Sequence, residues 1–350
     1  MNNMISVKNE RELVIMRKAC KITAAARALA GEMVRPGVTT KQIDKAVYEF
    51  ILSQGAKPTF LGYGGFPAST CISINEVVIH GIPGNRVLKE GDIVSVDVGA
   101  TWGGFTGDCA ATFACGVISP TAQKLITVTE QSFYEGIKFA RQGNRISDIG
   151  HAVQTYVESH GFGVVRAFVG HGVGEKMHEE PEVPNFGSPG RGPRMVKGMT
   201  LAIEPMVTEG TYDVRVLKDG WTTVTADGKL AAHYENSILI TDGEPEILPV
   251  TEGLEAMEVD KSSLVVSKAG RDQGQLFYVI DADEQYVYLA DGKSRRLEKP
   301  KRKKRKHIEQ IPRTESRIAE KIRNGEKVLN SELRKELASL GQKQSQNQGG

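Results

Sequence analysis

Two stretches of this chain repeat one another at a nearly constant spacing. The segment 91–97 (GDIVSVD) matches 198–204 (GMTLAIE) at a spacing of 107, and each copy runs from a glycine to a carboxylate. Five further residues recur at a spacing of 106: Gly37, Ile43, Ala46, Val47 and Gly55 match Gly143, Ile149, Ala152, Val153 and Gly161. The shared spacing favours an internal duplication. It predicts an α/β (α+β) fold with two related halves, each contributing an acidic strand end.

Local patterns predict the elements of the first half. Apolar residues at helical spacing indicate helices over residues 10–33 and 40–54, which Pro36-Gly37 and Gly55 close. The segment 93–113 is typical of a β-hairpin around Gly103-Gly104.

Pairing Trp102 with Phe105 in this hairpin would place position 99 opposite Asp108, with Asp97 diagonal to it on the same face. Diagonal neighbours lie roughly 7–8 Å apart, close enough for two carboxylates to share cations. Without cations the two charges would repel, and one carboxylate would be protonated.

Size and cysteine usage limit the class of protein. The 350 residues allow one large domain and a small one, and no apolar run is long enough to cross a membrane. The N-terminus does not resemble a secretion signal, and the four scattered cysteines suit a reducing compartment. We expect a cytoplasmic protein without membrane association, and a monomer.

Five polar residues stand in otherwise apolar, strand-like or Gly-rich segments: Asp97, Asp108, His171, Glu204 and Glu235. A buried carboxylate is normally paired, protonated or bound to metal, because burying it alone is costly. Four carboxylates and one imidazole form a ligand set suited to Mn²⁺, Fe²⁺ or Co²⁺ and open to Zn²⁺.

The segments around these residues resemble the signature of type I methionine aminopeptidases. They are HGIPG (80–84), SVDVGATWGGFTGD (95–108), GHGVGEKMHEEPEVPNFG (170–187), AIEP (202–205) and HYENSILIT (233–241), and the resemblance covers roughly residues 5–250. It implies the pita-bread fold with two pseudo-symmetric halves. It also implies removal of the initiator methionine from nascent polypeptides whose second residue is small, by two-metal hydrolysis (EC 3.4.11.18).

The resemblance also assigns roles. Asp97 would chelate one metal ion, Asp108 and Glu235 would bridge two, and His171 and Glu204 would complete the other site. Glu204 would assist proton transfer, His178 would hydrogen-bond the scissile carbonyl, and His80 would orient the adjacent amide. The methionine pocket would be lined by Tyr63, Phe66, Cys71 and Trp221, whereas Phe60 and Met177 depart from residues common in the family.

Other enzymes and a non-enzyme are weaker alternatives. Prolidase and aminopeptidase P carry a large domain before the first catalytic histidine, for which His80 leaves no room. Type II methionine aminopeptidases have a long insertion where only thirty residues separate Glu204 from Glu235 here. A metal-dependent nuclease or phosphatase is a third possibility, but the chain has no phosphate-binding loop of the pattern Gly-x-x-x-x-Gly-Lys-Ser/Thr. A pseudoenzyme would be expected to lose ligands.

The C-terminal part differs in charge and pattern. Residues 261–350 hold 21 Lys and Arg against 12 Asp and Glu, whereas residues 1–260 are acidic. Residues 263–300 resemble a KOW-type SH3-like barrel of ribosomal proteins, with strands over 276–280 and 286–289. Apolar spacing over 311–340 predicts short helices before a disordered Gln/Gly tail.

This asymmetry is typical of an added polyanion-binding region. We expect binding to ribosomal RNA through the basic residues Lys299, Lys301, Arg302, Lys303, Lys304, Arg305 and Lys306. A solvated charge run or a nuclear-type signal is the alternative for this segment. For the whole chain, the alternative is a ribosome- or RNA-binding protein with a vestigial peptidase body. The expected divisions are 1–252 (peptidase), 253–307 (barrel) and 308–350 (tail).

Overall fold

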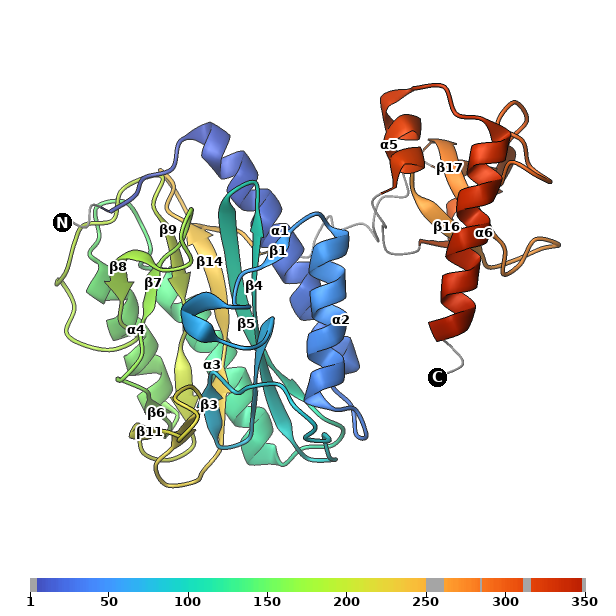
Figure 1. Ribbon diagram of the computed structural model, residues 1–350. Helices are drawn as coiled ribbons and strands as arrows, with labels where there is room; N and C mark the ends of the chain where they lie inside the picture. Colours follow the sequence, from blue (N-terminus) through green and yellow to red (C-terminus); the bar gives the residue numbers. More distant parts are fainter. Residues whose placement is uncertain (1–4, 250–260, 284, 311–315, 348–350) are drawn as a thin grey trace. The chain divides into compact units, whose positions relative to one another are not determined.

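The computed structural model describes residues 5–249, 261–283, 285–310 and 316–347 (Figure 1). The chain divides into two compact units, Met1–Thr251 and Glu252–Gly350, here called the N-terminal and C-terminal units. Among the described helices, none has both the length and the apolar character needed to cross a bilayer.

A nine-stranded sheet forms the centre of the N-terminal unit. Its main path follows β1 (Lys57–Pro58), β4 (Ile93–Trp102), β5 (Phe105–Ala114), β14 (Glu235–Leu239), β9 (Thr200–Ile203), β7 (Gly170–Gly172) and β8 (Glu179–Val183), while β2 (Thr70–Ile74) pairs with β4 and β15 (Glu246–Ile247) with β14. One small sheet contains β13 (Ala231–His233), β10 (Met206–Thr208) and β6 (Gly163–Val164). Another contains β11 (Val214–Val216), β12 (Thr223–Thr225) and β3 (Val77–Ile79).

Four long helices cover this sheet: α1 (Glu10–Met33), α2 (Thr40–Ser53), α3 (Pro120–Ile137) and α4 (Ile146–Ser159), with a short 3₁₀ turn, η1 (Tyr63–Gly65). Helices α1 and α2 share a core with β2 and β4, and α3 and α4 share one with β9 and β14 (Figure 1). Capping explains several helix starts. Asn9 and Thr39 each form a capping box, and Ser119 caps α3.

The predicted duplication is present in the structure. Helices α2 and α4 begin and end 106 positions apart. The matched glycines also share an unusual backbone, since φ is 91° at Gly37 and 92° at Gly143, and 91° at Gly91 and 89° at Gly198. Side chains other than glycine rarely adopt such angles. The repeated glycines therefore preserve the same turns in both halves.

The predicted hairpin has the predicted register. Trp102 pairs with Phe105 and Gly99 with Asp108. Gly103 and Gly104 both have positive φ, as a tight two-residue turn requires. Asp97 and Asp108 therefore lie on one face of β4 and β5, near the middle of the large sheet.

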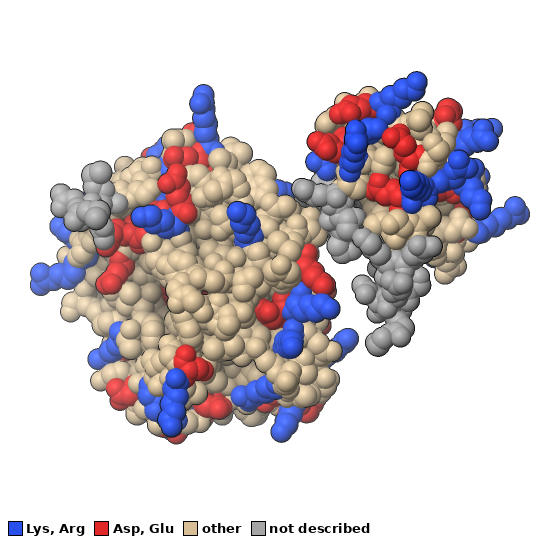
Figure 2. All heavy atoms as spheres, viewed as in Figure 1, with Lys and Arg blue, Asp and Glu red and all other residues tan. Residues whose placement is uncertain are grey.

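The described part of the C-terminal unit is an antiparallel sheet with two helices. The strand order is β19 (Lys301–Lys304), β18 (Tyr286–Ala290), β17 (Leu276–Ala282), β16 (Leu264–Ser267) and β20 (Ile308–Gln310), with a 3₁₀ turn, η2 (Arg305–His307), before β20. Such a sheet is compatible with the predicted small barrel, and the SH3-like architecture stays a prediction. Figure 2 shows Lys and Arg side chains standing among Asp and Glu on this unit.

Residues after 307 do not form a separate tail. Strand β20 pairs with β16, and the helices α5 (Arg317–Asn324) and α6 (Asn330–Asn347) add Ile318, Ile322 and Leu333 to a core with Tyr278. The division predicted at 307–308 therefore falls inside one unit. Helix α6 also continues to Asn347, through part of the Gln-rich segment for which the sequence predicted disorder.

Candidate metal centre and active site

The five predicted metal ligands lie on, or directly after, five neighbouring strands. Asp97 is on β4, Asp108 on β5, Glu235 begins β14, Glu204 follows β9, and His171 is on β7. Asp97 and Glu235 both face Ala110 of β5 in register, from opposite sides of that strand. Residues far apart in the chain therefore converge where the two halves of the sheet meet.

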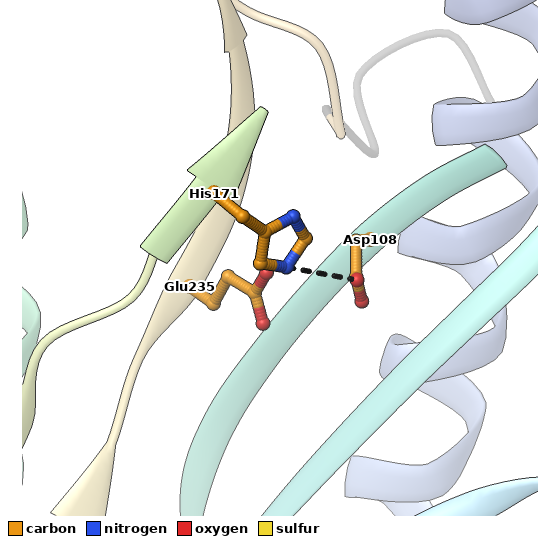
Figure 3. Close-up of side chains that lie close together, drawn as sticks. All are labelled: Asp108, His171 and Glu235. Carbon is orange, nitrogen blue, oxygen red and sulfur yellow. Dashed lines mark ion pairs between the residues drawn. The ribbon is translucent and has the colours of Figure 1, made fainter. Parts of the chain in front are cut away.

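Figure 3 shows the imidazole of His171 lying between the carboxylates of Asp108 and Glu235. The His171 Nε2 atom is 3.9 Å from Asp108 Oδ2 and 3.6 Å from Glu204 Oε1. Its Nδ1 lies 2.8 Å from the carbonyl oxygen of Gly172. Because a carbonyl only accepts, Nδ1 carries the proton, and the lone pair of Nε2 faces the carboxylates.

The four carboxylates, here called the acidic cluster (Asp97, Asp108, Glu204 and Glu235), form no ion pair with Lys or Arg in the part of the chain that the structure describes. Among the described residues, their close ion-pairing partners are histidines. Buried oxygens of Asp97, Asp108 and Glu235 also have no hydrogen-bond partner. Such orphaned oxygens beside an imidazole lone pair fit a divalent cation, which would supply the missing positive charge.

The pKa values follow from this arrangement. Burial raises the pKa of Asp97 to about 7. Burial, and then the charges of neighbouring carboxylates, raises the pKa values of Asp108, Glu204 and Glu235 well above the usual range. Burial, and then the charge of His178, lowers the pKa of His171 to about 4, so its imidazole is neutral at pH 7. A metal ion would oppose the raised carboxylate values by favouring the ionised forms.

One cavity contains the acidic cluster, His171 and every other predicted active-site residue: His80, His178, Tyr63, Phe66, Cys71 and Trp221. The departures Phe60 and Met177 line it too, as does Phe168, which the sequence did not single out. The Phe66 and Trp221 rings meet edge to face at 5.1 Å, and Cys71 is buried beside Phe66. One wall of the cavity is therefore apolar and sulfur-containing.

Two histidines line the same cavity as this apolar wall and the acidic cluster. The His178 ring lies 4.3 Å from that of His171, and its Nδ1 is 2.7 Å from the Tyr63 hydroxyl. His80 packs edge to face on Trp221 and has φ of 58°, a conformation that non-glycine residues seldom adopt. Burial, and then the charge of His178, lowers the pKa of His80 to about 4, and burial lowers that of His178. Both imidazoles are uncharged near neutral pH.

Comparison with known proteins decides the family. Residues 14–242 match the model of metallopeptidase family M24. The chain is 58% identical over 245 residues to a methionine aminopeptidase of Clostridium perfringens, covering 70% of this chain and 98% of that protein. It is 51% identical to methionine aminopeptidase 1 of Bacillus subtilis, covering 70% and 99%. The chain belongs to the methionine aminopeptidases of family M24.

A solved structure agrees with this relationship. The crystal structure of methionine aminopeptidase from Rickettsia prowazekii superposes with a TM-score of 0.70 at 39% identity, covering 71% of this chain and all of that one. The N-terminal unit therefore has the pita-bread fold of the methionine aminopeptidases. The enzyme class and its dependence on divalent metal follow from the same relationship.

One buried residue beside the acidic cluster of this methionine aminopeptidase was not predicted from the sequence. His233 Nε2 lies 3.7 Å from Glu204 Oε2 and 3.9 Å from Glu235 Oε2, and it has no hydrogen-bond partner. A usable signal was present, because His233 stands two residues before Glu235, and residues at that spacing in an extended chain point to one side.

The predicted RNA-binding residues have unequal surroundings. Lys303 is only 9% exposed, and its ammonium group bonds to Ser267 Oγ, to the Ala269 carbonyl oxygen at 2.6 Å and to Asp272 Oδ2 at 3.3 Å. Lys301 Nζ lies 2.6 Å from Asp272 Oδ1. We call Lys301, Lys303 and Asp272 the lysine–aspartate cluster. Assigning Lys303 to RNA was wrong, because a buried, paired ammonium group cannot contact a phosphate.

The other predicted residues differ from Lys303. Lys299, Arg302 and Lys304 are exposed, and Arg305 is half-buried with its Nε donating to the carbonyl oxygen of Asp283 at 2.8 Å. The side chain of Lys306 lies outside the described part of the structure. The exposed basic residues therefore remain available for a partner.

Proposed function

We propose that the N-terminal unit removes the initiator methionine from nascent polypeptides in the cytoplasm when the second residue is small, by two-metal hydrolysis. The observation that carries this proposal is the acidic cluster, which has unpartnered buried oxygens and opens into the same cavity as an apolar, sulfur-containing wall. The polar part suits cleavage of an amide, and the apolar part suits a thioether side chain.

The acidic cluster and His171 would hold the metal ions. Two divalent ions, when bound, lower the pKa of a shared water molecule and polarise the scissile carbonyl. Asp97 would also attract the free amino group of the substrate, because its carboxylate faces the cavity. Glu204, partly open to the cavity, would accept the proton of the attacking water.

The two histidines would act on the substrate. If the Tyr63 hydroxyl donates to Nδ1 of His178, then Nε2 carries the proton and can donate to the carbonyl oxygen as negative charge develops. His80, held against Trp221, would orient the adjacent amide. Phe66, Cys71 and Trp221 would contact the methionine side chain.

Peptide hydrolysis tests this proposal. The intact protein should cleave Met-Gly peptides and lose activity on chelation, and Mn²⁺, Fe²⁺, Co²⁺ or Zn²⁺ should be added back singly to identify the activating ion. A formylated peptide or a Met-Lys peptide should be cleaved far more slowly, since the amino group must reach Asp97 inside a narrow cavity. Equal rates on Met-Gly and Met-Lys peptides would contradict the proposed specificity.

We also propose that the C-terminal unit binds ribosomal RNA through one face of β18 and β19. Strand β19 alternates, with Lys303 buried and Arg302 and Lys304 exposed. Arg302 pairs with Tyr288 and Lys304 with Tyr286, and the Arg302 guanidinium lies 3.6 Å from the Tyr286 ring centre. Tyrosine rings beside cationic groups suit base stacking next to phosphate contacts. The complete ligand set argues against a purely RNA-binding role for the chain.

Salt dependence tests this second proposal. If Arg302 and Lys304 each neutralise one phosphate, their double replacement by Gln should make the slope of log affinity against log salt less negative by roughly 1.4–1.8. The matched control replaces Arg323 and Lys327, which are exposed elsewhere on this unit, by Gln. An unchanged slope in the Arg302/Lys304 variant would show that this face does not bind the RNA backbone.

A further inference from the structure

His233 is a buried imidazole for which the described structure gives Nε2 no hydrogen-bond partner. The residue is 1% exposed, and its Nε2 points at two carboxylates of the acidic cluster. The separations of 3.7 and 3.9 Å are too long for direct hydrogen bonds. A buried polar nitrogen left in this way is costly unless another atom lies between it and the oxygens.

The surroundings of His233 mirror those of His171. Glu204 has one imidazole beside each oxygen, with His171 Nε2 3.6 Å from Oε1 and His233 Nε2 3.7 Å from Oε2. Two groups of side chains could each hold a metal ion, Asp108–His171–Glu235 and Glu204–His233–Glu235. In each group the potential ligand atoms lie within 4.8 Å of one another. Glu235 belongs to both.

These separations match coordination by a common ion. Donors that each lie about 2.1 Å from one ion are about 3.0–4.2 Å apart, as the angle between them opens from a right angle to a straight line. His233 Nε2 meets this condition with both carboxylates, as His171 Nε2 does with Asp108 and Glu204. For both histidines, the distance from Nε2 to the carboxylate oxygens is too long for a direct hydrogen bond. The same distances agree with an ion bound between the nitrogen and the oxygens.

We propose that His233 is a metal ligand, which binds through Nε2 to the ion held by Glu204 and Glu235. This inference rests on the proposed two-metal centre and adds a second imidazole to its ligands. Nitrogen donors strengthen binding of Fe²⁺, Co²⁺ and Zn²⁺ more than binding of Mn²⁺, which favours oxygen ligands. His233 therefore shifts the metal preference of the centre away from Mn²⁺.

NMR of the intact protein loaded with Co²⁺ tests this assignment without measuring activity. Each coordinated imidazole gives one strongly shifted N–H signal in histidine-¹⁵N-labelled protein. His171→Gln and His233→Gln should each remove a different signal from the wild-type spectrum. His151→Gln is the matched control, because His151 is an exposed histidine outside the cavity, and it should leave the spectrum unchanged.

Metal titration provides a second readout. His233→Gln should raise the Kd for Co²⁺ by about 10–100-fold and change the Kd for Mn²⁺ much less. Tryptophan fluorescence should confirm that the variant is folded, and His233→Asn provides a second replacement. If shifted signals are present but none depends on His233, and the affinity for Co²⁺ is unchanged, this assignment is overturned while the metal centre stands. Absence of any shifted signal in the wild type would overturn the metal centre itself.

Discussion

The two units each bury a cluster of charged side chains, and they balance the charge in opposite ways. In the lysine–aspartate cluster, the Asp272 carboxylate receives hydrogen bonds from two ammonium groups. In the acidic cluster, four carboxylates lie together without a Lys or Arg partner among the described residues, and three of them keep a buried oxygen without a hydrogen-bond partner. The first cluster completes itself within the fold, whereas the second is completed by an ion from outside. Buried charge is thus paired inside the C-terminal unit and left open to a metal ion in the N-terminal unit.

Replacing a bridging ligand should give the largest effect. Glu235→Ala and Asp108→Ala should each lower kcat by at least about 10³, because both ions lose a ligand and the loss exceeds that of a single hydrogen-bond donor. Metal binding should weaken in parallel, as titration calorimetry would measure. Retention of more than about a tenth of the wild-type kcat at saturating metal would exclude the two-metal assignment.

Substitutions that remove a charge but keep the side-chain volume test the contrast between the acidic cluster and the lysine–aspartate cluster. Glu235→Gln should stabilise the metal-free N-terminal unit because it relieves repulsion, whereas Asp272→Asn should destabilise the C-terminal unit. Both tryptophans, Trp102 and Trp221, belong to the N-terminal unit, so urea unfolding followed by their fluorescence reports that unit. Hydrogen exchange at β16 and β17 reports the other. Effects of the same sign in both units would refute the contrast.

His178 is uncharged and belongs to neither cluster, so its replacement should change catalysis without changing metal binding. His178→Ala should lower kcat by roughly 10²–10³ through loss of one transition-state donor, with metal stoichiometry unchanged. Steady-state kinetics together with metal analysis would check this. A variant that loses a metal ion instead would place His178 among the ligands.

Breaking the lysine–aspartate cluster should have a moderate effect on stability. Lys303→Met should destabilise the C-terminal unit by about 2 kcal/mol, because Asp272 keeps a buried charge with one partner fewer. The exposed Lys304 is the matched control, and Lys304→Met should change stability little. Hydrogen exchange across β16–β18 measures both. Equal protection in the two variants would mean that Lys303 is not part of the fold's charge balance.

The smallest predicted effect is a difference in pH dependence. The pKa of Asp97 is raised in the metal-free folded state to about 7, so the contribution of Asp97 to the stability of the N-terminal unit should fall as pH rises from about 4 toward 7. The lowered pKa values of His80 and His171 act in the opposite direction, so the Asp97 contribution is measured as the difference between the wild type and Asp97→Asn. Burial alone would raise the pKa of Asp272, but hydrogen bonds from Lys301 and Lys303 outweigh burial and lower it. The C-terminal unit should therefore lose stability as pH falls below about 4. Unfolding of each unit across this range, with a chelator present, would show whether the slopes oppose.

The sequence alone determined much of the N-terminal unit. Gly103-Gly104 set the hairpin register that places Asp97 and Asp108 on one face, because a two-residue turn leaves only one pairing. The repeated glycines and helix boundaries carried the internal symmetry. The five predicted ligands were recognisable because a charged residue in an apolar strand has a visible contrast with its neighbours.

Where neighbouring residues show no such contrast, only the tertiary structure determined which side chains are buried and which belong to the site. In the run KRKK (301–304) a strand buries alternate residues, but four basic side chains give no sign of which pair turns inward. Pairing of β19 with β18 placed Lys303 opposite the buried Val287, on the inner face, and Arg302 and Lys304 on the other. His233 likewise became part of the site because β9 and β14 pair and bring Glu204 beside it. Contacts between distant strands fix these positions, and no local pattern encodes them.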